Sequence, residues 1–161
     1  MITIVDVQYS CSLARAGCVV AHAWDDAAPI AEYTIVTEVS ADYVPGELYR
    51  RELPPLLEIL RRVDGFHTVV VDAHVWLGPD RPGLGARLHA ALGGAADVVG
   101  IAKNEFLGAP SLPVVRNHAR PLHVSSIGIA PDDAAARVAE MHGPYRIPTL
   151  VRRADQLARG R

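Results

Sequence analysis

A β-branched run that ends in an aspartate constrains the fold of this chain more than any other feature. Residues 66–71 include three consecutive valines, and Asp72 follows them directly. Apolar residues without polar alternation are typical of a strand that is buried on both faces. We therefore expect this strand at the centre of a sheet, between layers of helices. Residues 98–102 form a second run of this kind, which ends at Lys103.

Three further strands are expected before this central pair. Residues 2–7 form a β-branched run that carries Asp6 near its end, and residues 17–24 and 30–39 are apolar runs separated by turn-forming residues. Short connections between consecutive strands favour an antiparallel meander. A possible last strand covers residues 122–129.

Helices are expected between and after these strands. Leucines recur at helical spacing over residues 48–63, where Pro54 and Pro55 fit only if they lie in the first turn. Further helices are expected at 84–92, 132–142 and 150–157, and loops at 78–83 and 106–120.

Together these elements predict an α/β fold with a mixed sheet. The meander supplies antiparallel strands, the helix–strand units supply parallel strands, and helices flank the sheet. The length of 161 residues predicts one domain over residues 1–161, and the 50% apolar content is sufficient for a core.

Several classes of protein are not expected. No apolar run approaches the ~20 residues that span a bilayer, and the N-terminus lacks the pattern of a signal peptide. Cys11 and Cys18 are too few for a disulfide scaffold, so a cytoplasmic protein is expected. The seven histidines form no zinc motif, and the serine pair at 125–126 lacks the context of a hydrolase nucleophile.

Asp6 and Asp72 are the first candidates for chemistry. A carboxylate at the end of a buried strand is costly unless it is paired, hydrogen-bonded or bound to a cation. Two such strands side by side would bring together hard oxygen ligands that suit Mg²⁺ or Mn²⁺. The alternative is that each aspartate caps a following turn. Taken alone, Glu52 is typical of a solvated helix residue, and Lys103 of a surface lysine.

Five segments, in order along the chain, resemble the endonuclease V family. The first carries Asp6 within Val-Asp-Val-Gln-Tyr, and the second runs from a Tyr-Val-Pro-Gly loop to Arg-Glu at Glu52. The others contain Val-Val-Asp-Ala-His, Gly-Ile-Ala-Lys and Tyr-Arg-Ile-Pro with a following Ala-Asp pair. The segments cover residues 5–9, 43–52, 70–74, 100–103 and 145–155.

This resemblance implies a ribonuclease H-like fold and a metal-dependent nuclease. It implies that Asp6, Glu52 and Asp72 bind Mg²⁺ (or Mn²⁺) and that Lys103 lies in the active site. The implied reaction is metal-assisted hydrolysis of a phosphodiester bond in DNA or RNA near a deaminated purine, inosine or deoxyinosine. The implied substrate-binding residues are Tyr43, Val44, Pro45, Gly46, Ala73 and His74.

Two alternatives remain open because the chain departs from the family pattern. Ala73 and Val75 stand where the family has glycines. The family usually has Ser-Pro-Gly-His where this chain has Ser126-Ile127-Gly128, so that histidine is absent. Arginine supplies every base except Lys103; residues 146–161 carry a charge of +4, whereas the whole chain carries −2. A chain with this balance neutralises few phosphates outside its C-terminal segment. The same fold would then act on a small molecule such as a nucleotide or biosynthetic intermediate, or bind nucleic acid or a partner without cutting.

Overall fold

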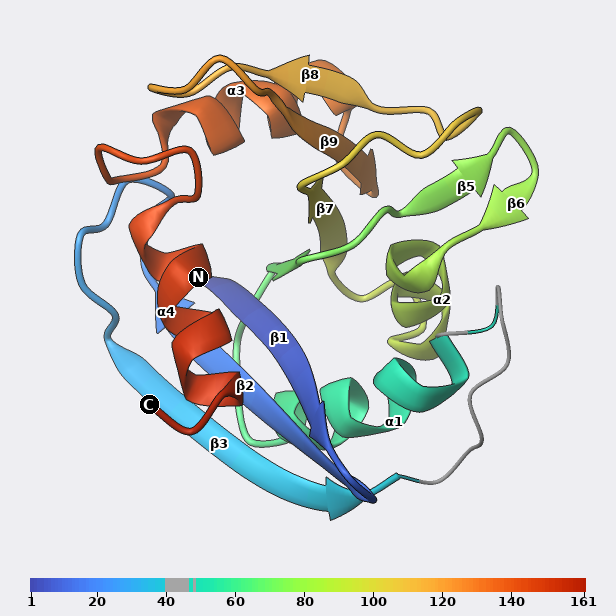
Figure 1. The fold of residues 1–161 in the computed structure, drawn as a ribbon, viewed down its shortest axis with the longest axis vertical. Helices are drawn as coiled ribbons and strands as arrows, with labels where there is room; N and C mark the ends of the chain where they lie inside the picture. Colours follow the sequence, from blue (N-terminus) through green and yellow to red (C-terminus); the bar gives the residue numbers. More distant parts are fainter. Residues whose placement is uncertain (40–46, 48) are drawn as a thin grey trace.

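The computed structural model describes residues 1–39, 47 and 49–161. Its centre is a seven-stranded sheet in the order β3-β2-β1-β4-β7-β9-β8 (Figure 1). These strands are β1 (Ile2–Ser10), β2 (Leu13–Ala21), β3 (Ala31–Glu38), β4 (Thr68–Val71), β7 (Asp97–Ala102), β8 (Leu112–Val114) and β9 (Leu122–Ile127). The remaining elements are the hairpin strands β5 (Trp76–Gly78) and β6 (Arg81–Pro82) and the helices α1 (Tyr49–Leu60), α2 (Leu84–Ala91), α3 (Pro131–Glu140) and α4 (Thr149–Ala158).

The sheet combines the two strand arrangements that the sequence predicts. Strands β1, β2 and β3 form an antiparallel meander, whereas β1, β4 and β7 run parallel to one another. Strand β9 is antiparallel to both β7 and β8. In register, Val5 pairs with Val71, and Val71 pairs with Gly100. The carboxyl ends of the three parallel strands therefore meet at one edge of the sheet.

Two helical layers cover the sheet. Helices α1 and α2 lie on one face, and α3 and α4 lie on the other (Figure 1). Alternation along β1 explains this division: Ile2 and Ile4 belong to the core beneath α3 and α4, whereas Val5 and Val7 belong to the core beneath α1. The predicted α/β mixed sheet flanked by helices is confirmed.

Helix α4 lies directly on β2 at Gly17. A Cβ atom at this position would lie 2.5 Å from the carbonyl oxygen of Ala154 and 2.7 Å from the amide nitrogen of Ala158. Only glycine allows this close approach without displacing the helix. The contact brings the C-terminal half of α4 next to the end of β1.

Several expected boundaries are wrong. The second strand begins at Leu13 rather than 17, and the expected loop at 106–120 contains strand β8. The second strand ends at Ala21 rather than 24, because Asp26 accepts hydrogen bonds from the amides of His22 and Ala23 and turns the chain. Pro54 and Pro55 lie beyond the first turn of α1, which begins at Tyr49. The helix continues because its buried face packs against the sheet, and this burial offsets the two missing amide donors. The expected loop at 78–83 contains part of the β5–β6 hairpin.

In the part of the chain that the structure describes, no helix is both long and apolar enough to cross a membrane.

Candidate active site

The candidate site lies where the three parallel strands end. Asp6 lies in β1, Asp72 follows β4 directly, and Lys103 follows β7 directly. Because the ends of these strands are in register, the three side chains come to the same edge of the sheet. Glu52 reaches this edge from the first turn of α1.

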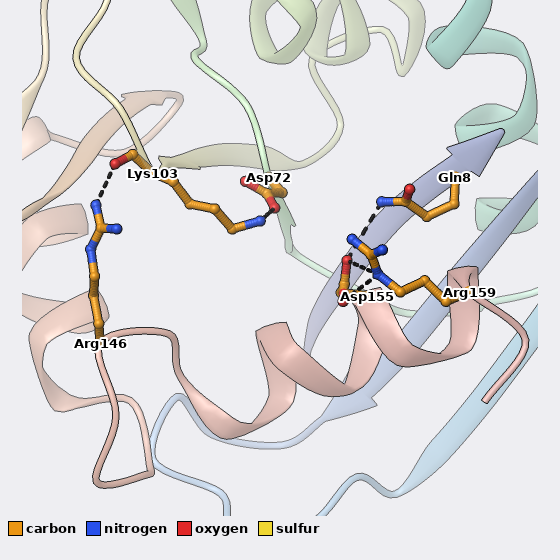
Figure 2. A network of polar contacts seen from close by, with 6 residues as sticks. All are labelled: Gln8, Asp72, Lys103, Arg146, Asp155 and Arg159. Atoms are coloured by element: carbon orange, nitrogen blue, oxygen red, sulfur yellow. Dashed lines mark hydrogen bonds and ion pairs between the residues drawn. The ribbon is translucent and has the colours of Figure 1, made fainter.

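Lys103 and Asp72 form an ion pair across this edge. The Lys103 ammonium donates a hydrogen bond to Oδ2 of Asp72 (Figure 2). The Asp72 side chain is 19% exposed, so its charge is only partly solvated, whereas Lys103 is 43% exposed. The lysine therefore supplies the counter-charge that this carboxylate requires.

Asp6 and Glu52 show the electrostatic properties of a carboxylate cluster. Burial raises the pKa of Asp6 to about 6, and the charge of Asp72 contributes to this rise. Burial raises the pKa of Glu52 to about 7, and the charges of Asp6 and Asp72 contribute. Oδ2 of Asp6 is buried and has no hydrogen-bond partner within the described residues. The three carboxylates are thus close enough to repel one another.

This donor set fits a hard divalent cation. Carboxylate oxygens are the protein ligands that Mg²⁺ and Mn²⁺ prefer, and a cation would relieve both the repulsion and the unpartnered oxygen of Asp6. Among the described residues, no three His, Cys, Asp or Glu side chains are already arranged to hold a metal ion. The Lys103 ammonium instead occupies Oδ2 of Asp72, so binding at all three carboxylates requires side-chain rearrangement.

A cavity of about 490 Å³ opens beside the acidic residues. Glu52, Asp72 and Lys103 line it together with Ala73 and His74. The His74 ring nitrogen Nε2 lies 3.0 Å from the carbonyl oxygen of Asn104, which anchors the ring. The expected substrate positions Ala73 and His74 therefore share a cavity wall with two of the acids. Tyr43, Val44, Pro45 and Gly46 lie outside the described residues.

Close packing fixes the segment after Asp72. This segment crosses β7 at Gly100, where a Cβ atom would overlap the carbonyl oxygen of Ala73 and lie 3.0 Å from the amide nitrogen of Val75. The Val75 amide donates a hydrogen bond of 2.9 Å to Oγ of Ser125 on β9. Ser125, which lacks the sequence context of a hydrolase nucleophile, thus helps to hold the cavity wall.

Three residues for which the sequence indicates no role lie at this edge: Asp155, Arg159 and Gln8 (Figure 2). Asp155 on α4 accepts a hydrogen bond of 2.9 Å from Nε of Arg159 and one of 3.5 Å from Nε2 of Gln8. Its charge contributes to the raised pKa of Asp6. The signal was present in the Ala-Asp pair of the last resembling segment, but its place beside β1 depends on how α4 packs.

Arg146 holds the backbone at Lys103 in place. Its guanidinium donates a hydrogen bond to the carbonyl oxygen of Lys103 (Figure 2). It donates another, of 2.7 Å, to the carbonyl oxygen of Pro121. The start of the loop after β7 is therefore tied to the segment that leads into α4.

Known proteins are similar to this chain in sequence. The family model described as Endonuclease V matches residues 1–122. The chain belongs to the Endonuclease V family. An Endonuclease V of Streptomyces avermitilis is 34% identical over 154 residues, a match that covers 81% of this chain and 66% of the relative. The chain thus matches about two thirds of the length of this curated relative.

Solved structures of the Endonuclease V family share the fold. The crystal structure of Endonuclease V from Streptomyces avermitilis superposes with a TM-score of 0.83 at 33% identity, and covers 99% of this chain and 79% of that one. Endonuclease V of Ciona intestinalis, solved in complex with a 24mer DNA containing an inosine followed by a ribo-adenosine, gives a TM-score of 0.79 at 17% identity. This second match covers 99% of this chain and 84% of that chain, and it supports the ribonuclease H-like fold alone.

Proposed function

We propose that this chain hydrolyses a phosphodiester bond in DNA or RNA that contains a deaminated purine, with Mg²⁺ or Mn²⁺ held by Asp6, Glu52 and Asp72. The observation that carries the proposal is the cluster of mutually repelling carboxylates at the edge of the sheet, two of them in the wall of a 490 Å³ cavity. Membership of the Endonuclease V family supports the nuclease activity. The inosine-containing DNA bound by the Ciona relative supports the substrate.

Each group of this chain has a defined task in that reaction. A divalent cation, when bound, polarises the phosphate and lowers the pKa of a coordinated water. Asp6, Glu52 and Asp72 supply the negative charge that retains it. Lys103 brings positive charge to the developing charge on the phosphate oxygens, and its release from Asp72 frees a carboxylate oxygen for the cation. Ala73 and His74 contact the nucleotide in the cavity.

Cleavage of an oligonucleotide with a single inosine tests the proposed reaction. We expect product with Mg²⁺ or Mn²⁺ and none with EDTA, because the carboxylates alone cannot neutralise the charge of the transition state. DNA and RNA strands, with adenosine in place of inosine as the matched control, are compared by gel electrophoresis. Absence of metal-dependent cleavage of every inosine strand would contradict the proposal. Binding without cleavage would favour the non-catalytic alternative.

Lys103→Ala is expected to separate catalysis from metal binding. Loss of the ammonium should reduce the cleavage rate by roughly 10²-fold or more, since a preorganised positive charge is removed from the phosphate. Metal affinity should stay equal or rise severalfold, because the ammonium no longer competes for Oδ2 of Asp72. Calorimetric titration with Mn²⁺ and single-turnover cleavage check both results. A large fall in metal affinity would show that Lys103 organises the carboxylates rather than the substrate.

A further inference from the structure

A groove lies next to the acidic residues, where the sheet extends beyond the end of α4. Gln8 on β1 pairs in register with Arg15 on β2, and Arg15 pairs with Val36 on β3. Directly paired residues present their side chains on the same face of a sheet, so these three form one row. The preceding row contains Asp6 and Gly17, on which α4 packs. The row with Arg15 therefore lies at the margin of the helical cover.

This row is the floor of a cavity of about 440 Å³. Arg159, the residue that follows α4, forms part of the wall, and Leu13 and Ser10 of the β1–β2 hairpin lie at the other end. Leu13 and Val36 are 43% and 49% exposed. Apolar side chains at this exposure leave room for a ligand above the strands.

The charge of this groove is positive. Arg15 and Arg159 line it, and none of the described lining residues is acidic. Arg15 forms no ion pair with the part of the chain that the structure describes. Arg159 binds Asp155 through Nε, which leaves its two terminal nitrogens without a hydrogen bond to described residues. The guanidinium of Arg15 and the terminal nitrogens of Arg159 are therefore available to an anion.

The groove lies close to Asp6 of the acidic site. Gln8 is two residues after Asp6 on the same face of β1, a separation of roughly 7 Å along a strand. Its amide reaches Asp155, which also binds Arg159. A nucleic-acid strand whose scissile phosphate lies at the carboxylates would therefore bring a neighbouring phosphate to the arginines.

We propose that the groove between the end of α4 and the Gln8–Arg15–Val36 row binds a backbone phosphate of the nucleic-acid strand, adjacent to the one that is cut. Arg15 is the main contact, because a guanidinium offers two parallel donors to phosphate oxygens. The contact is to the backbone, so it does not depend on the base. The inference rests on the proposed function, since it places the same strand at the acidic site.

Binding of fluorescently labelled single strands, measured by anisotropy in EDTA over a range of salt concentrations, tests this groove. We expect Arg15→Ala to weaken binding about tenfold at low salt and to reduce the slope of log affinity against log salt by about one. The loss should be equal for strands with and without inosine. Arg137→Ala removes the same charge in α3, beside the opposite edge of the sheet, and should leave both quantities unchanged.

A second pair of variants guards against a general effect of Arg15→Ala on folding. Val36→Glu and Val36→Gln have nearly equal size at an exposed position and differ in one charge. We expect the glutamate to weaken binding at least fivefold relative to the glutamine. The proposed role of the groove would be overturned if Arg15→Ala and Val36→Glu both bound with the affinity and salt slope of the wild type.

The same measurements distinguish failure of the groove from failure of the proposed reaction. Wild-type protein that binds strands through Arg15 but cuts none would contradict the reaction and support the groove. Cleavage of inosine strands with unchanged binding by the Arg15 and Val36 variants would contradict the groove alone. No binding of any strand by the wild-type chain would overturn both.

Discussion

Asp6→Asn is expected to reduce cleavage about a thousandfold or more, and also to make the stability of the metal-free protein less sensitive to pH. The first effect follows from the loss of one of three carboxylates that retain the cation. The second follows from the raised pKa of Asp6, because burial and the charge of Asp72 oppose its ionisation in the folded state.

The sign of the pH effect follows from the direction of these shifts. Burial raises the pKa of Asp6 from 3.8 to about 6 in the folded protein, and the pKa of Glu52 from 4.5 to about 7. Between these limits the folded state binds more protons than the unfolded state, so stability falls as pH rises from about 4 to 7. We expect the wild-type chain to lose roughly 1–3 kcal/mol between pH 5 and pH 8 in EDTA.

Urea unfolding at pH 5 and pH 8 measures this difference. Asp6→Asn should lose distinctly less stability over this range, because one buried charge is gone and no longer raises the pKa of Glu52. Mg²⁺ should restore the stability of the wild-type chain at pH 8 but affect the variant much less. Asp64→Asn, at an exposed position between α1 and β4, is the matched control and should follow the wild type. Equal pH dependence in all three proteins would contradict the carboxylate cluster.

Two of the three acids could be placed from the sequence because their position depends on strand order alone. Asp6 and Asp72 end runs of apolar residues, and parallel neighbours bring such ends together. Glu52 carries no such signal, since an acidic residue in the first turn of a helix is common on solvated surfaces. Its inclusion required the resemblance to a family, and the raised pKa now supports that assignment as a proposal.

The residues contributed by α4 were beyond prediction for a different reason. Asp155 approaches β1 only because α4 packs against β2 at Gly17, a contact between segments more than 130 residues apart. A basic helix with one aspartate has no pattern that reveals which strand it covers. The local turn at Asp26, which shortens β2, is likewise set by side-chain hydrogen bonds rather than by hydrophobic pattern.

The pairing of Lys103 with Asp72 also explains why the carboxylates are not already arranged around a cation-sized space. Three like charges at the edge of a sheet repel, and the Lys103 ammonium pairs with one of them, Asp72. A cation would replace that ammonium on Asp72 and free it for the phosphate. Such an exchange would couple metal binding to the release of Lys103, and the opposite effects expected for Lys103→Ala test this coupling.

Gly100→Ala is expected to cause the largest loss of stability among single substitutions near the site, about 2–4 kcal/mol. The added methyl group would overlap the carbonyl oxygen of Ala73 and would also crowd the amide nitrogen of Val75 and the hydroxyl of Ser125, which are hydrogen-bonded to each other. The strain should be relieved by movement of the segment after Asp72, which would break the hydrogen bond from Val75 to Ser125. Unfolding in urea measures the cost.

Cleavage by this variant shows whether the position of the segment matters for catalysis. We expect the rate to fall at least tenfold under conditions where the variant is fully folded, because the Asp72 carboxylate moves with the chain that follows it. Gly93→Ala, after α2, meets no described atom within 4 Å and should cost only about 1 kcal/mol of backbone strain, with wild-type cleavage. A folded Gly100→Ala protein with the wild-type rate would show that the carboxylates are positioned independently of the Ala73 wall. In that case Ala73 and His74 would contribute to substrate binding alone, and any effect of Gly100→Ala on cleavage would appear in KM rather than in kcat.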